Sequence, residues 1–266
     1  MASEARRRHA APLIITFDEH PAAVLRGTSA PPLLTTTDER LRLLSEETGE
    51  EAVLLLPFTH ALAQLTAAQF MRRLHDEHNV RTLVLGYDHR FGHDRLARFT
   101  DYQRAGQDIG IDIVRAQEAP SPAPISSSRI RNLLLDGHVE TAAQLLSRPY
   151  FLRGNVVGGF HIGRQLGYPT ANIQPLSPRK LIPANGVYDV RVALADTTHH
   201  GMLYIGHRPT FNGQEKTIEA HLFHFHDNLY DQQVRIDFIR FIRPERTFSS
   251  PEQLQQQLRQ DQQACL

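Results

Sequence analysis

The chain has 266 residues, enough for one large domain or two modest domains with cores of their own. It carries 29 basic and 29 acidic residues, so no net charge recruits nucleic acid or an anionic membrane surface. Its one cysteine, Cys265, excludes an internal disulfide and a cysteine-based metal cluster, and no apolar run reaches the ~18 residues of a membrane span. We therefore expect a soluble, cytoplasmic protein that binds any anionic ligand through local contacts.

Short apolar runs alternate with amphipathic segments in the first half of the chain. Thr36 with Glu39, and Thr66 with Gln69, have the spacing of capping boxes and mark the starts of two helices. Strands separated by helices predict a parallel sheet, so we expect an α/β domain over residues 1–147. Four runs have the length and β-branched content of its strands: residues 13–17, 52–56, 82–86 and 111–114.

A proline-rich break over residues 119–124 precedes a cluster of serines. Ser126, Ser127 and Ser128 are followed by basic and apolar residues, which is typical of a helix start. The free N–H groups of a helix N-terminus attract anions, and Arg131 would lie in the first turn. These residues indicate either a phosphate site or, equally well, an ordinary serine cap with solvated arginines.

The pattern changes after about residue 150 from helical periods to strict alternation. Such alternation predicts antiparallel strands with one buried face, enough for a small barrel. Ser250 as N-cap, Pro251 and Gln253 then start a closing helix. We place the domain boundary near residue 147 and the second domain at residues 148–266. The clearest alternating segments are residues 187–194, 218–225 and 234–239.

Residues 154–172 contain five glycines ahead of a Pro-Thr-Ala-Asn turn. A loop so poor in side chains allows backbone amides to approach phosphates closely. The segment lacks the Gly-Lys-Ser/Thr ending of a Walker A loop. Thr170 and Asn172 point to the same side of an extended chain and could share a hard cation such as Mg²⁺ with phosphate oxygens. The alternative, which the residues alone favour, is a β-hairpin rich in turn glycines.

Glu219 lies in an alternating segment beside aromatic residues. Alternation places Glu219, His221 and Phe223 on one face and Ile218 and Ala220 on the other, and either face could be the core. A carboxylate in such surroundings is a candidate general base. Because exposed strand glutamates are common, the pattern alone favours an ordinary surface residue.

Several blocks of the sequence resemble the signatures of riboflavin kinases and of the FAD synthetase (FMN adenylyltransferase) domain fused to them in bacteria. The resemblance implies a Rossmann-like nucleotidyltransferase domain, then a six-stranded barrel that transfers the γ-phosphoryl group of ATP to the ribityl 5′-hydroxyl of riboflavin. The kinase-like blocks are residues 154–172, 205–211, 218–221 and 243–248. The synthetase-like blocks are residues 16–21, 86–92 and 126–131.

The resemblance also implies a role for each site residue. Glu219 would be the base, and Arg243 and Glu245 would belong to a flap over the flavin. Phosphoryl transfer needs positioning and charge neutralisation, which such residues supply. Four further residues would bind ATP: Gly159 and Arg164 along the phosphates, and Thr170 and Asn172 at Mg²⁺ and phosphate. Where the family has Leu-Tyr-Gly this chain has Leu229, Tyr230 and Asp231, so aspartate would occupy a position at which glycine provides positive φ.

The first half departs from the synthetase pattern. That domain opens with a strand and a His-x-Gly-His turn that grips ATP phosphates, and the chain has neither. The strand would be central in a doubly wound sheet, and each large apolar side chain left uncovered forfeits roughly 1.5–3 kcal/mol. We therefore expect a truncated domain that does not adenylylate FMN. A vestigial phosphate site would comprise Ser126, Ser127, Ser128 and Arg131.

Three hypotheses follow. The main one is an ATP- and Mg²⁺-dependent riboflavin kinase with a truncated synthetase domain, whose partners are riboflavin, ATP and FMN, without nucleic acid or membrane. The second is a bifunctional riboflavin kinase and FMN adenylyltransferase whose start lies upstream in the gene. The third is a flavin-binding protein without turnover.

Overall fold

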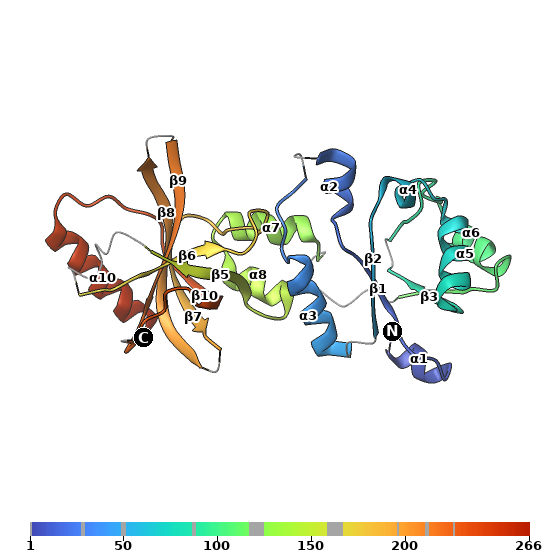
Figure 1. Ribbon diagram of the computed structural model, residues 1–266, viewed down its shortest axis with the longest axis horizontal. Helices are drawn as coiled ribbons and strands as arrows, with labels where there is room; N and C mark the ends of the chain where they lie inside the picture. Colours follow the sequence, from blue (N-terminus) through green and yellow to red (C-terminus); the bar gives the residue numbers. More distant parts are fainter. Residues whose placement is uncertain are drawn as a thin grey trace. The chain divides into compact units, whose positions relative to one another are not determined.

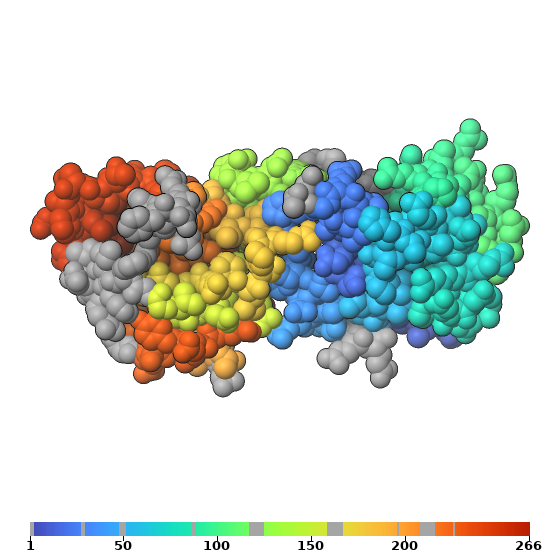
Figure 2. Space-filling model, turned by 45° about the horizontal axis from the view of Figure 1, so that its top comes forward, coloured from blue at the N-terminus to red at the C-terminus, as the bar shows by residue number. Residues whose placement is uncertain are grey.

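The computed structural model describes residues 2–27, 30–48, 52–86, 89–116, 125–158, 167–195, 197–210, 213–225 and 227–266; the rest are grey in Figures 1 and 2. The chain divides into two compact units. The first comprises Met1–Pro31 and Thr35–Pro122, and the second comprises Pro32–Leu34 and Ala123–Leu266. The sequence-based boundary near residue 147 lies at the end of a helix, α8, which belongs to the second unit.

The first unit has α/β architecture with parallel strand pairs, as predicted. Strand β1 (Ile14–Phe17) pairs with β2 (Val53–Leu56), and β3 (Thr82–Leu85) pairs with β4 (Asp112–Arg115). Among the described residues the four strands form two two-stranded sheets. The helices of this unit are α1 (Ala2–Arg7), α2 (Pro21–Arg26), α3 (Thr37–Thr48), α4 (His60–Ala63), α5 (Ala67–His78) and α6 (Phe99–Gln107).

Both predicted capping boxes start helices of this unit. The Gln69 amide donates to Thr66 Oγ1 at 3.1 Å, and the Thr66 amide donates to the Gln69 side chain at 2.9 Å. Thr36 and Glu39 make the same reciprocal pair at the start of α3. Each pair satisfies two amides that a helix terminus leaves without intrahelical partners.

The second unit contains a closed six-stranded barrel in the order β10-β5-β6-β9-β8-β7, every neighbour antiparallel (Figure 1). The predicted barrel and closing helix are therefore confirmed. Its strands are β5 (Tyr150–Val157), β6 (Ala171–Pro175), β7 (Gly186–Ala193), β8 (Thr198–Thr210), β9 (Gly213–Leu222) and β10 (Gln233–Arg243). Its helices are α7 (Ser127–Leu135), α8 (Val139–Leu146) and α10 (Pro251–Cys265).

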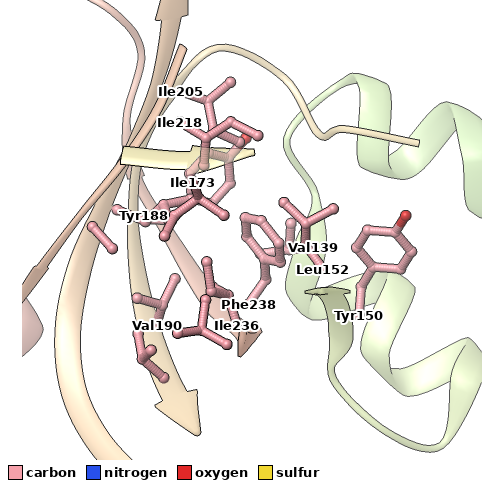
Figure 3. Close-up of a cluster of buried hydrophobic side chains, with 14 of the residues drawn as sticks. Val139, Tyr150, Leu152, Ile173, Tyr188, Val190, Ile205, Ile218, Ile236 and Phe238 are labelled. Atoms are coloured by element: carbon pink, nitrogen blue, oxygen red, sulfur yellow. The ribbon is translucent and has the colours of Figure 1, made fainter. Parts of the chain in front are cut away.

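The barrel interior forms the main core. Figure 3 shows side chains of several strands pointing toward one another and toward Val139 of α8. On β9 the inward residues are Ile218 and Ala220, which are 3% and 1% exposed. Glu219 therefore projects from the outer face, where a second apolar cluster joins β7 and β8 to Cys265 of α10.

A short segment of the N-terminal half is part of the barrel unit. The Leu33 amide donates to the Arg179 carbonyl at 2.7 Å, and the Leu181 amide donates back to the Leu33 carbonyl at 2.9 Å. The ammonium of Lys180, a residue 5% exposed, donates to the Leu34 carbonyl at 2.8 Å and faces the rings of Tyr150 and Phe151. These contacts satisfy the buried charge and anchor residues 32–34.

Candidate functional site

The barrel register places three polar side chains in one row on its outer face. Asn172 of β6 pairs directly with Glu219 of β9, and Glu219 pairs on its other side with Tyr204 of β8. Directly paired residues share a face of the sheet, so the three side chains are neighbours. The predicted partners Asn172 and Glu219 are thus brought together, and the structure adds Tyr204.

Thr170, in the chain just before β6, completes this group. Its Oγ1 donates to Glu219 Oε2 at 3.1 Å, and both residues are partly exposed. An alcohol and a carboxylate in contact at an accessible place can share a proton or a ligand. The residues that the resemblance assigns to metal binding and to base catalysis, Thr170 and Glu219, are therefore in direct contact.

The neighbouring residues Pro169 and His221 are also in contact. His221 Nδ1 lies 2.7 Å from the Pro169 carbonyl oxygen, and the ring of Tyr168 packs edge-on against the imidazole at 5.2 Å. Burial lowers the pKa of His221, and the hydrogen bond to the carbonyl partly offsets that effect. Burial thus favours the neutral imidazole.

A second polar cluster surrounds Glu245. Its carboxylate accepts hydrogen bonds from the Tyr204 hydroxyl and from Asn185 Nδ2, the latter at 3.2 Å. Asn185 Nδ2 also lies 2.8 Å from His207 Nδ1. A Cβ on Gly206 would overlap the Tyr204 hydroxyl, so glycine leaves the room in which this hydroxyl reaches Glu245. Through Tyr204, the Glu245 cluster adjoins Glu219.

The guanidinium of Arg243 binds the C-terminal helix. It donates to both oxygens of Asp261, with Nη2 2.7 Å from Oδ2, and the side chains are 10% and 1% exposed. Gln257 donates to the same carboxylate at 2.9 Å. A bidentate pair this buried fixes the end of β10 against α10. The predicted flavin contact of Arg243 stays a prediction.

The glycine-rich segment is only partly within the described residues. Its two ends belong to β5 and β6, which pair in antiparallel fashion as in the hairpin alternative, with Val157 opposite Asn172. Gly159 and Arg164, the predicted ATP-phosphate contacts, lie outside the described residues.

The serine cluster begins α7 of the barrel unit. Ser126 caps this helix by accepting from the Arg129 amide at 3.2 Å, and Ser126, Ser127 and Ser128 are exposed. Arg131 Nε donates to the Pro32 carbonyl at 2.8 Å. The serine cap of the alternative is thus present, although Arg131 is partly buried rather than simply solvated. The assignment of these residues to a phosphate site stays a prediction.

No local sequence pattern assigns a site role to Tyr204, Asn185 or His207, although His207 lies in the kinase-like block 205–211. Tyr204 carries no local motif, and only its pairing with Glu219 brings it to the site. Asn185 precedes Gly186, and an Asn-Gly pair signals a turn more readily than a polar cluster. A signature that spans three strands is visible only after the register is known.

Among the described residues, no three His, Cys, Asp or Glu side chains are placed to hold a metal ion. Within the same residues, no helix is both long enough and apolar enough to span a bilayer. A cation at Thr170 and Asn172 would need oxygens from a ligand, as is usual for Mg²⁺ held with substrate phosphates.

Comparisons with known proteins match both halves of the chain. A family model described as riboflavin kinase matches residues 146–266, and one described as FAD synthetase matches residues 1–129. The expectation that the first half lacks adenylyltransferase function is not supported by this second match.

Relatives named bifunctional riboflavin kinase/FMN adenylyltransferase extend over nearly the whole chain. The protein of Escherichia coli (strain K12) is 35% identical over 265 residues, 98% of this chain and 84% of the relative. That of Listeria monocytogenes is 34% identical over 94% of this chain and 80% of the relative. A crystal structure titled macrolide-efflux protein from Streptococcus pneumoniae superimposes with a TM-score of 0.89 at 32% identity, covering 99% of this chain and 86% of that one. The chain therefore belongs to the family of bifunctional riboflavin kinases/FMN adenylyltransferases.

Proposed function

We propose that the barrel unit is a riboflavin kinase, which transfers the γ-phosphoryl group of ATP to the 5′-hydroxyl of riboflavin and yields FMN. The observation that carries the proposal is the 3.1 Å contact between Thr170 Oγ1 and Glu219 Oε2, with Asn172 paired to Glu219. It unites a candidate base with two oxygen donors in a domain matched by the riboflavin kinase model.

In this mechanism Glu219 orients the riboflavin hydroxyl and accepts its proton as the oxygen attacks the γ-phosphorus. The O–P bond to riboflavin forms as the bond to the ADP leaving group breaks. The hydrogen bond from Thr170 holds the carboxylate at the turn. Tyr204 lies on the other side of Glu219 and directs its hydroxyl to Glu245.

The donor chemistry of Thr170 and Asn172 fits a hard divalent cation such as Mg²⁺. Both offer neutral oxygens, and the Glu219 carboxylate lies beside them. Bound there with ATP, Mg²⁺ would neutralise phosphate charge. Gly159 and Arg164 are proposed to bind the phosphates, by resemblance to the kinase signatures.

Arg243 and Glu245 are proposed to position the flavin. The Asp261 ion pair orients Arg243, and the Tyr204 and Asn185 hydrogen bonds orient Glu245. A ligand that approaches this edge of the barrel would therefore meet side chains whose rotamers are already fixed, which lowers the entropy lost on binding.

We propose FMN adenylyltransferase activity for the first half as a second function. The FAD synthetase match to residues 1–129 and the names of the relatives support it. By resemblance to the synthetase signatures, Ser126, Ser127, Ser128 and Arg131 are candidate phosphate contacts, since exposed serines at a helix start suit an anion.

Product analysis tests both proposals. The full chain is incubated with riboflavin, ATP and Mg²⁺, and products are separated by chromatography with flavin fluorescence. FMN with FAD supports both functions, and FMN alone supports only the kinase. Unchanged riboflavin, together with retained flavin binding, would overturn the kinase proposal in favour of a binding protein.

A further inference from the structure

Among the described residues, side chains of β9 contact the turn that presents Thr170, which lies just before the paired residues of β6. Strands β6 and β9 pair at Ala171 with Ala220 and at Asn172 with Glu219. The residue before Thr170 is Pro169, which has no N–H to donate to a neighbouring strand. The Pro169 carbonyl still needs a donor, and His221 Nδ1, 2.7 Å away, supplies it.

The chemistry of this contact fixes the state of the imidazole. A carbonyl oxygen only accepts hydrogen bonds, so Nδ1 carries the proton in the neutral ring. His221 is 9% exposed. The centroid of its ring lies 5.2 Å from that of Tyr168 and 5.7 Å from that of Phe223. Tyr168 in turn donates through its hydroxyl to Gln262 of α10 at 3.3 Å. Packing on both sides therefore aims Nδ1 at one carbonyl.

The hydrogen bond from His221 to the Pro169 carbonyl lies directly beside the contact between Thr170 and Glu219. Glu219 and His221 are on the same outer face of β9, so the strand makes two parallel attachments to the turn. Glu219 accepts a hydrogen bond from the Thr170 side chain, and His221 donates to the carbonyl of Pro169, the residue before Thr170. Rotation of the Pro169–Thr170 peptide would carry Oγ1 away from the carboxylate.

We propose that His221 is a positioning residue for phosphoryl transfer, because its Nδ1–H holds the Pro169 carbonyl and so keeps Thr170 against Glu219. This inference rests on the proposed kinase function. Loss of the hydrogen bond lowers kcat more than it raises KM for riboflavin, since the misplaced group acts in the transition state.

A matched pair of variants tests the hydrogen bond. His221→Leu fills a similar volume without a donor, whereas Asn places a side-chain N–H near the position of Nδ1. We expect His221→Leu to lower kcat roughly 10- to 100-fold, with KM for riboflavin changed less than about threefold. His221→Asn restores most of kcat. Equal losses in the two variants, or an unchanged kcat in His221→Leu, would overturn the proposal.

A measurement of the position of the turn can fail or succeed independently of the proposed kinase activity. Threonine-methyl NMR, with the Thr170 signal assigned through Thr170→Ser, reports the position of the turn whether or not FMN forms. The Thr170 signal shifts in His221→Leu and stays near the wild-type position in His221→Asn. If the leucine variant does not fold, His221→Met, which also lacks a hydrogen-bond donor, takes its place. An unshifted signal in a folded donor-free variant contradicts the proposal even if the wild type makes no FMN.

Discussion

Strand pairing differs between the two units of the chain. Each of the six described barrel strands has a neighbour on both sides, so the closed barrel itself has no edge strand. In the first unit each of β1 to β4 has one partner among the described residues. The four residues of β1 are all partly exposed, whereas β7 buries Gly186, Val187, Tyr188, Asp189, Val190 and Val192.

This difference bears on how firmly each unit holds a site. The Glu219 row crosses three consecutively paired strands of a closed barrel, so its side chains cannot shift without disturbing the register. Strands with one partner and partly exposed side chains gain less stabilising free energy from the burial of apolar surface. We therefore expect the barrel to be both the kinase and the more stable unit.

The largest expected effect separates the activities of the two halves. Glu219→Gln removes the proposed base but keeps an oxygen to accept from Thr170, so FMN formation falls about 10²- to 10⁴-fold. FAD formation from supplied FMN stays unchanged, because that activity is proposed for the first half, which does not contain Glu219. Initial rates with riboflavin and with FMN measure the two reactions. Glu252→Gln, at an exposed position of α10, is the control and retains both. A kinase rate in Glu219→Gln equal to that of the control would refute the assigned role.

Removal of the buried carboxylate of Asp261 strongly destabilises the barrel unit. In Asp261→Asn the Arg243 charge, 10% exposed, loses its counter-ion, and the expected loss is about 3–5 kcal/mol in the free energy of unfolding. Amide hydrogen exchange of the barrel strands measures it. Glu77→Gln breaks an exposed ion pair with Arg73 in the first unit and costs about 0.5 kcal/mol. Similar losses in the two variants would mean that burial does not determine the value of these pairs.

Equivalent truncations in the two units compare their packing directly. Ile236 is fully buried in the barrel, so Ile236→Ala lowers the unfolding free energy of that unit by about 2–5 kcal/mol. Ile15 of β1 is partly exposed, and Ile15→Ala costs its own unit about 1 kcal/mol. Unit-resolved hydrogen exchange tests both. A larger loss at Ile15 would reverse the comparison.

The smallest effect concerns the backbone at Asp231. Its φ is +61°, as expected for a position where the family has glycine. Asp231→Gly relieves the left-handed strain and stabilises the barrel by about 0.5–1 kcal/mol. Thermal unfolding measures the gain, with Asp231→Ala as the control that keeps a Cβ. A glycine variant no more stable than the alanine variant would show that the turn carries no strain.

Local patterns determined much of the architecture. Apolar runs and alternation located the first-unit strands and three barrel strands, and side-chain spacing located helix starts at Thr66 and Ser250. These signals involve residues within a few positions of one another, which propensity and periodicity encode. The inward face of β9 stayed open in the sequence, because alternation identifies two faces without saying which one the barrel encloses.

The site itself was decided by tertiary structure. Thr170 and Glu219 are 49 positions apart, and their contact follows from the pairing of β6 with β9. Arg243 meets Asp261 because α10 packs against the barrel, and no local sequence pattern indicates this contact. The sequence by itself determined which segments become helices and strands and which residue types are available for chemistry. Register and barrel closure decided which of them touch, because contacts between distant segments depend on the packing of the whole core.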